Sequence, residues 1–134
     1  MSKTVLIVDD ERLLVRTLST VLREAGYRTL TAASGEQAER CLGTEAATDV
    51  VVLDNRLPKK SGLDVLRYIR EMDLPCRVIL MTAYDSRDVK QEAERLRVDR
   101  YVLKPFDLPY MVSAIAELMA PGGQSIDPRD RGGR

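Results

Sequence analysis

The chain has 134 residues, with 21 basic and 21 acidic side chains and no histidine. This length suits one domain with a substantial core, and the balanced charge excludes an electrostatic argument for binding nucleic acid or an anionic membrane. Without histidine, carboxylates, hydroxyls and lysines must carry any chemistry. Cys41 and Cys76 are too few for a disulfide framework or metal cluster, and the N-terminus is neither a signal peptide nor a membrane span. We therefore expect a cytoplasmic protein with reduced thiols.

Short apolar segments alternate with amphipathic segments from the N-terminus onward. Residues 4–8 form the first apolar run and predict a buried strand. The following helix is predicted to place one stripe inward, namely Leu14, Leu18, Val21, Leu22 and Ala25. Gly26 ends this helix, because the position after a helix favours left-handed backbone. Residues 27–32 predict a weaker strand at a sheet edge, and Ser34 and Gln37 have the spacing of a capping box that opens the second helix.

The other three strand–helix pairs repeat this pattern. Residues 50–53, 77–81 and 101–103 predict strands, and the helices that follow are predicted to be capped by Ser61, by Asp85 or Ser86, and by Asp107. Strict alternation predicts an α/β fold, a single doubly wound five-stranded parallel sheet with five flanking helices. We assign residues 1–120 to this domain. Residues 121–134, rich in glycine, proline and arginine, predict a flexible tail or the start of a linker.

Reactive side chains follow four of the five predicted strands. They are Asp9 and Asp10, Asp54, Thr82 and Lys104. Each alone is an ordinary cap, turn or solvated residue, but parallel strands direct their C-terminal ends to one edge, where open α/β sheets bind ligands. Three carboxylates without histidine or cysteine ligands favour Mg²⁺, Mn²⁺ or Ca²⁺. The lysine and the hydroxyl suit the oxygens of a phosphoryl group, and an aspartate suits covalent acceptance of phosphate.

These residues stand in motifs that closely resemble the receiver domain of bacterial two-component response regulators. The motifs are Val8-Asp9-Asp10-Glu11, Leu53-Asp54 with Leu57-Pro58 and Gly62, Met81-Thr82-Ala83-Tyr84, and Tyr101 with Lys104-Pro105-Phe106. The resemblance covers residues 4 to about 119. It implies the flavodoxin-like strand order 2-1-3-4-5.

The resemblance assigns the chemistry of the site to particular residues. Asp54 matches the phosphoacceptor, which takes a phosphoryl group from a phosphohistidine of a sensor histidine kinase or phosphotransfer protein. Asp10, Asp54 and the backbone carbonyl of Arg56 match the direct ligands of Mg²⁺, and Asp9 matches a ligand acting through water. Mn²⁺ is the alternative ion. The protein is then no enzyme but a stoichiometric acceptor with self-catalysed phosphotransfer and dephosphorylation.

The resemblance also implies a switch. Thr82 and Lys104 match the positions that contact the phosphoryl group, and Pro105 resembles the cis-proline of the family. When phosphate draws the Thr82 hydroxyl inward, the ring of Tyr101 is expected to enter the vacated space. The remodelled surface comprises the fourth helix, fifth strand and fifth helix and would control an output partner or domain. A phosphorylation-dependent homodimer through this surface is a further expectation, without membrane association or direct nucleic-acid binding by this domain.

The sequence departs from the family pattern at several positions. Arg97-Val98 stands where the family usually has Gly-Ala, so we expect the turn after the fourth helix to be built differently. Arg56 and Tyr84 lie where the family varies and phosphate lifetime is tuned; they either restrict the attacking water or are simply exposed.

Three other functions are alternatives to the receiver. A phosphatase or phosphotransferase of the aspartyl-phosphate class needs a second acid two residues after a nucleophile on the first strand, whereas Asp9 and Asp10 are adjacent. A nucleotide- or flavin-binding module needs a glycine-rich loop after the first strand, and this sequence has none there. The remaining alternative is a degenerate receiver that acts as a phosphorylation-independent interaction module, although all five site residues are present.

Overall fold

The fold is a five-stranded parallel sheet between two layers of helices, seen in a computed structural model that describes residues 2–44 and 47–120. The strands are β1 (Thr4–Val8), β2 (Arg28–Ala32), β3 (Val50–Asp54), β4 (Arg77–Thr82) and β5 (Arg100–Leu103). Their order is β2-β1-β3-β4-β5 and every neighbouring pair is parallel. Both the fold class and the strand order are thereby confirmed, and the predicted tail at 121–134 lies outside the described residues.

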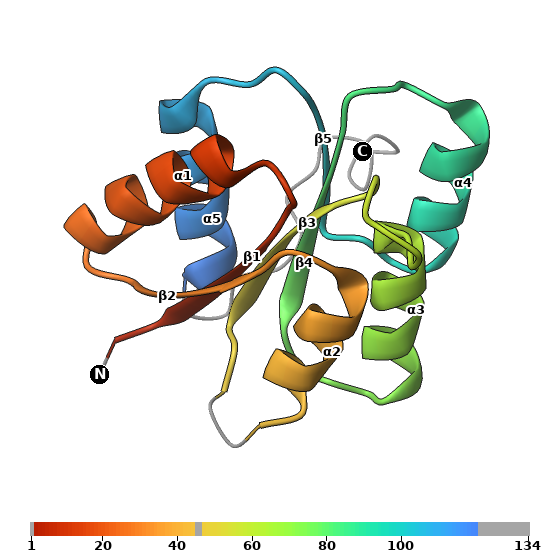
Figure 1. The fold of residues 1–134 in the computed structure, drawn as a ribbon, viewed down its shortest axis with the longest axis horizontal. Coiled ribbons are helices and arrows are strands. Elements are labelled where there is room, and N and C mark those ends of the chain that lie inside the picture. Colours follow the sequence, from red (N-terminus) through yellow and green to blue (C-terminus); the bar gives the residue numbers. More distant parts are fainter. Residues whose placement is uncertain (1, 45–46, 121–134) are drawn as a thin grey trace.

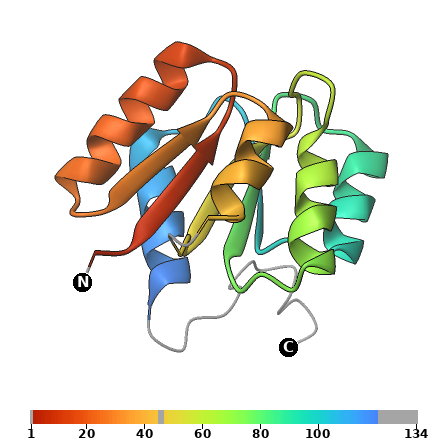
Figure 2. The ribbon, with the colours of Figure 1, turned by 60° about the horizontal axis from the view of Figure 1, so that its bottom comes forward.

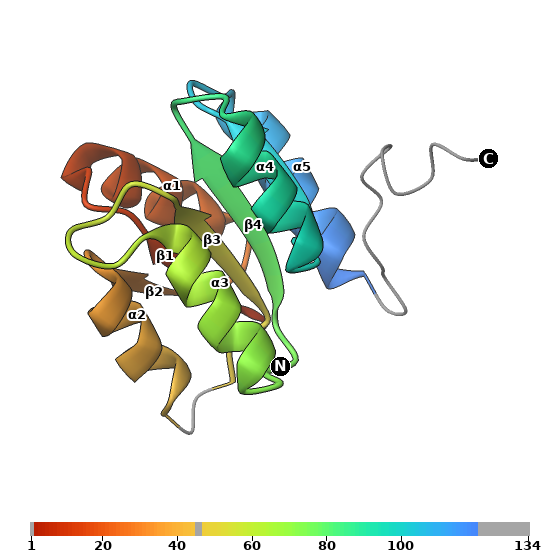
Figure 3. The ribbon, with the colours of Figure 1, turned by 90° about the vertical axis from the view of Figure 1, so that its right-hand side faces the viewer.

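The helices divide between the two faces of the sheet. α1 (Arg12–Glu24) and α5 (Leu108–Met119) cover one face, while α2 (Gly35–Leu42), α3 (Gly62–Glu71) and α4 (Arg87–Arg95) form a row on the other (Figures 1 and 3). Along β1, Val5 and Ile7 pack in the core beneath α1 and α5, whereas Leu6 and Val8 pack beneath α2–α4. Burial on both faces explains why β1, β3 and β4 are largely continuous apolar runs rather than alternating ones, whereas β2 at the edge of the sheet is more polar and more exposed. Among the described helices, none is long and apolar enough to cross a membrane.

Serine side chains begin three of the helices, as their positions in the sequence predicted. Ser34, Ser61 and Ser86 each accept a hydrogen bond from the backbone N–H three residues later. At α3 the Asp64 carboxylate also accepts from the Ser61 N–H at 3.0 Å, which completes a capping box. The prediction for Asp107 was wrong in part. It occupies the N-cap position of α5, but its side chain makes no capping hydrogen bond.

The inward face of α1 differs from the predicted stripe at its end. Leu18 and Leu22 are fully buried, but Ala25 is exposed because the helix ends at Glu24. Ser19, which was not part of the predicted stripe, is also buried. Gly26 follows with a φ of 99°, the left-handed conformation predicted for it.

The turn between α4 and β5 was expected to differ from the left-handed turn of the family, and this expectation was wrong. Arg97 has a φ of 59°, so the left-handed turn is kept although a non-glycine residue occupies it. Arg70 of α3 stabilises this backbone, because its guanidinium donates to the carbonyls of Leu96 at 2.9 Å and Arg97 at 2.7 Å. Hydrogen bonds from a charged donor are worth about 1.5–3 kcal/mol each, which can offset the conformational cost.

Candidate functional site

Three carboxylates meet at the C-terminal edge of the sheet. Asp9 and Asp10 follow β1 and Asp54 ends β3, and these strands are neighbours with Val8 paired to Leu53. Figure 2 shows the loops after β1 and β3 at the same edge of the sheet. One oxygen from each carboxylate lies within 4.8 Å of the others, with Asp9 and Asp54 buried and Asp10 exposed. The predicted convergence is confirmed, and this set fits a hard cation such as Mg²⁺, which uses few carboxylates and retains water.

Burial and like charge make Asp54 a weaker acid than usual. Burial, and next the charge of Asp9, raise the pKa of Asp54 from 3.8 to about 6, against the opposing effect of Lys104. Burial alone would lower the pKa of Lys104, but its hydrogen bonds to Asp9 and Glu11 raise it well above its ordinary range. The ammonium is therefore charged at neutral pH, and the carboxylates hold more negative charge than one lysine neutralises. A divalent cation would remove this excess.

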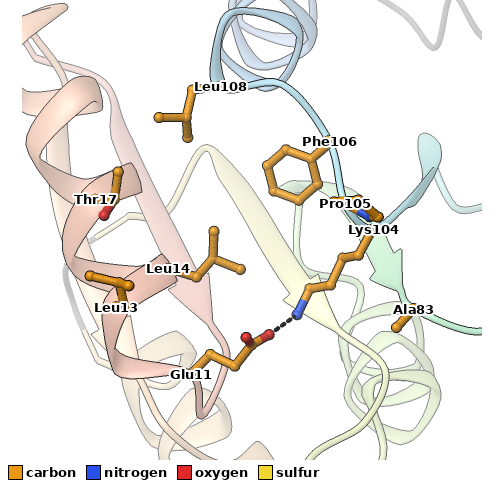
Figure 4. A pocket seen from close by; sticks show the side chains of 9 residues that line it. All are labelled: Glu11, Leu13, Leu14, Thr17, Ala83, Lys104, Pro105, Phe106 and Leu108. Carbon is orange, nitrogen blue, oxygen red and sulfur yellow. Dashed lines mark hydrogen bonds and ion pairs between the residues drawn. The ribbon is translucent and has the colours of Figure 1, made fainter.

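Lys104 joins the loop after β5 to the carboxylates. Its ammonium lies 2.7 Å from Asp9, 2.7 Å from Glu11 and 3.3 Å from Asp54. Figure 4 shows the contact with Glu11, which reaches over from the start of α1. Sequence reasoning gave Glu11 no role in the site. Its position directly after the two aspartates was the one available signal.

The Thr82 hydroxyl is held by the loop that follows β4. It donates to the carbonyl of Tyr84 at 3.0 Å and accepts from the Tyr84 N–H at 3.1 Å. Thr82 is buried and lies one residue beyond Met81, the register partner of Asp54. To donate to a phosphoryl oxygen, the hydroxyl must give up its bond to the Tyr84 carbonyl.

Arg56 and Tyr84 form an exposed pair between the loops after β3 and β4. The Arg56 guanidinium donates to the Tyr84 hydroxyl at 3.1 Å and stacks 4.7 Å from the ring centroid. Both side chains are exposed, which was one of the two alternatives predicted from the sequence. The contact between them was not predicted. The role of the Arg56 carbonyl as a metal ligand stays a prediction.

Tyr101 is half-buried on β5 and packs against the core under α2–α4. The Lys90 ammonium of α4 lies 5.8 Å from its ring centroid. This places the ring at the predicted switch surface, whereas its movement stays a prediction. The Lys104–Pro105 peptide bond is cis, as the resemblance implied.

Gly62 lies against the backbone of Asp54 and Asn55. A Cβ added there would stand 2.5 Å from the Asp54 carbonyl oxygen and 2.8 Å from the Asn55 Cα. The Gly62 N–H donates to the Asn55 carbonyl at 3.0 Å, which fixes this close approach. Only glycine fits where the loop after β3 returns to begin α3.

A groove of about 550 Å³ opens beside Lys104, between α1 and the loop after β5 (Figure 4). Its walls are mostly apolar and are formed by Leu13, Leu14, Thr17, Pro105, Phe106 and Leu108, with Glu11 and Lys104 at one end. Leu13 is 76% exposed, so it adds accessible apolar surface to this groove.

Comparison with known proteins identifies the family. A family model described as the response regulator receiver domain matches residues 5–116. The chain is 34% identical over 119 residues to the sporulation initiation phosphotransferase F of Bacillus subtilis. The aligned region covers 89% of this chain and 95% of that protein. It is 35% identical over 130 residues to the alkaline phosphatase synthesis transcriptional regulatory protein PhoP of B. subtilis, covering 92% and 54%. The chain thus spans about half the length of that regulator.

Solved structures agree with this assignment. The receiver domain of the Francisella response regulator 1452 superposes with a TM-score of 0.80 at 28% identity, covering 87% of this chain and 96% of that one. The BeF3-activated DrrB receiver domain gives 0.79 at 28% identity, covering 89% and 98%. The chain belongs to the receiver domain family of two-component response regulators.

Proposed function

We propose that this chain is a phosphorylation-controlled switch in which Asp54 accepts a phosphoryl group from a histidine of a partner. The observation that carries this proposal is the buried Asp54, with two further carboxylates within 4.8 Å and Lys104 at 3.3 Å. In the transfer, the P–N bond to the donor imidazole breaks and a P–O bond to an Asp54 carboxylate oxygen forms. The released imidazole takes a proton from water. The donor histidine lies outside these 134 residues, which contain none.

Each site residue has a proposed part in this reaction. Asp10, Asp54 and the Arg56 carbonyl would hold Mg²⁺ directly, with Asp9 acting through water and Mn²⁺ as the alternative ion. A bound divalent cation supplies positive charge that offsets the phosphoryl oxygens and the clustered carboxylates. Lys104 contacts one phosphoryl oxygen, and it already lies in the site.

Thr82 couples the phosphoryl group to the surface. Its hydroxyl exchanges a neutral hydrogen bond to the Tyr84 carbonyl, worth about 0.5–1.5 kcal/mol net, for a charged one worth about 1.5–3 kcal/mol. Only bonds that are absent from the unphosphorylated protein bias the switch, namely those that Thr82 and Lys104 form with the phosphoryl group. Moving an equilibrium from 1:99 to 99:1 needs about 5.5 kcal/mol. We therefore propose a partial shift of Tyr101 and of the α4–β5–α5 surface, which an output target or self-association completes.

The groove beside Lys104 supports a docking position for the donor. A phosphohistidine can reach Asp54 only if the donor protein contacts the surface around the site. The exposed Leu13, with Leu14 and Phe106 behind it, offers apolar surface at that position. A sensor histidine kinase or phosphotransfer protein that presents an apolar side chain beside its histidine would fit this groove.

Direct labelling tests the proposal. The protein is incubated with Mg²⁺ and phosphoramidate, and its intact mass is compared with that of Asp54→Asn and of a sample in EDTA. We expect one phosphoryl group on the parent with Mg²⁺ and none in the other two samples. Equal labelling of the variant would overturn the assignment of Asp54. An unlabelled parent would favour the degenerate receiver.

A further inference from the structure

The Lys104 ammonium is surrounded by carboxylates in this structure. Two of its three N–H donors bind Asp9 and Glu11 at 2.7 Å, and the ammonium also forms an ion pair with Asp54 at 3.3 Å. The lysine side chain is only 12% exposed, so water has little access to it. A phosphoryl oxygen that binds Lys104 must therefore compete with these carboxylates for the ammonium.

Glu11 is the partner that can leave at least cost. Asp9 is buried and also accepts the Glu11 backbone N–H at 2.9 Å, and the contact with Asp54 passes to the phosphoryl group that this residue carries. The Glu11 side chain, in contrast, is 63% exposed and does not cap α1. Within the described part of the chain, its carboxylate bonds to Lys104 alone.

We propose that Glu11 is a positioning residue that occupies Lys104 in the unphosphorylated protein and is displaced by the phosphoryl oxygen. This inference rests on the proposed function of Asp54. Glu11 then competes with phosphate, so it lowers both the rate and the extent of phosphorylation. Exposed ion pairs change an equilibrium constant by up to about fivefold, which sets the size of the effect.

The exchange also alters the docking groove. Glu11 and Lys104 line one end of the groove (Figure 4), and the Lys104 ammonium lies 3.3 Å from Asp54. Once Lys104 binds a phosphoryl oxygen in place of Glu11, the Glu11 carboxylate is unpaired and faces solvent at this end of the groove. The surface that the donor contacts is therefore more negative after transfer than before it.

Glu11→Gln tests this role, because it keeps the shape of the side chain and removes its charge. Glu24→Gln, near the other end of α1, is the matched control with the same change in net charge. We expect Glu11→Gln to raise the initial rate of labelling by phosphoramidate and the affinity for beryllium fluoride about two- to fivefold at low salt. The gain should shrink as salt screens the pair. Glu24→Gln should behave as the parent does.

A second measurement needs no metal. In EDTA, urea unfolding of Glu11→Gln, Lys104→Met and the double variant forms a double-mutant cycle. We expect a coupling of about two- to fivefold in the unfolding equilibrium constant. If the parent is labelled but Glu11→Gln and Glu24→Gln are labelled at the same rate, the role of Glu11 is wrong while the proposed function stands. The same conclusion follows if the double-mutant cycle shows no coupling. An unlabelled parent would overturn the proposed function and this inference together.

Discussion

Replacing Asp54 by asparagine should stabilise the metal-free protein at neutral pH. The carboxylate is buried, and its pKa is raised from 3.8 to about 6. Each pKa unit corresponds to about 1.36 kcal/mol, so the ionised carboxylate costs the folded state about 3 kcal/mol. The buried asparagine amide is left imperfectly paired, which returns about 1–2 kcal/mol of this gain. We expect a net increase of about 1–2 kcal/mol in the free energy of unfolding.

The sign of the pH dependence follows from the direction of the shift. Because the folded-state pKa is raised, the unfolded chain releases this proton first, and the parent loses stability as pH rises from about 4 through about 6. The advantage of Asp54→Asn should therefore be full above pH 7 and fade as pH falls below 6. Urea unfolding in EDTA at pH 7.5, 6 and 4.5 measures it, with Asp85→Asn as a control for loss of one exposed charge.

Two outcomes would refute this reasoning. Asp54→Asn could be no more stable than the parent at pH 7.5, which would show that Lys104 already compensates the carboxylate fully. Alternatively its gain could be the same at all three pH values, which would show that packing rather than ionisation is the cause.

Three further changes test other parts of the structure. Mg²⁺ at about 100 times its Kd should stabilise the parent by about 2.7 kcal/mol in urea unfolding and Asp54→Asn by clearly less; an equal effect would place the ion elsewhere. Gly62→Ala should cost about 1–3 kcal/mol and slow labelling of Asp54, because the new methyl group meets the Asp54 carbonyl at 2.5 Å. Gly43→Ala, whose Cβ would meet nothing closer than 3.4 Å, is its control, and equal stability of the two would contradict the close approach. Arg97→Gly should stabilise the protein by about 0.5–1 kcal/mol by relieving the left-handed residue, after the added entropy of the unfolded chain is subtracted. Arg97→Ala should give no such gain, and thermal unfolding of both variants decides.

The sequence by itself determined the architecture and the convergence of three aspartates, but it did not indicate the contact of Glu11 with Lys104. Strands buried on both faces must be continuous apolar runs, and parallel strands must be joined by helices, so periodicity and alternation were sufficient for the fold class. The convergence of Asp9, Asp10 and Asp54 followed from the same topology, since parallel strands end at one edge. The strand order came from family resemblance, because neither feature distinguishes which strands are neighbours.

The tertiary structure alone decided how those residues are partnered. Glu11 and Lys104 are 93 positions apart, and their 2.7 Å contact depends on how α1 and the loop after β5 meet above the sheet. Arg97 takes a conformation that its own side chain disfavours, because Arg70 on another helix binds the turn. The pKa of Asp54 likewise depends on its burial and on the charge of Asp9, which follows the neighbouring strand β1. Local sequence sets backbone preferences, whereas such contacts are set by packing between elements distant in the chain.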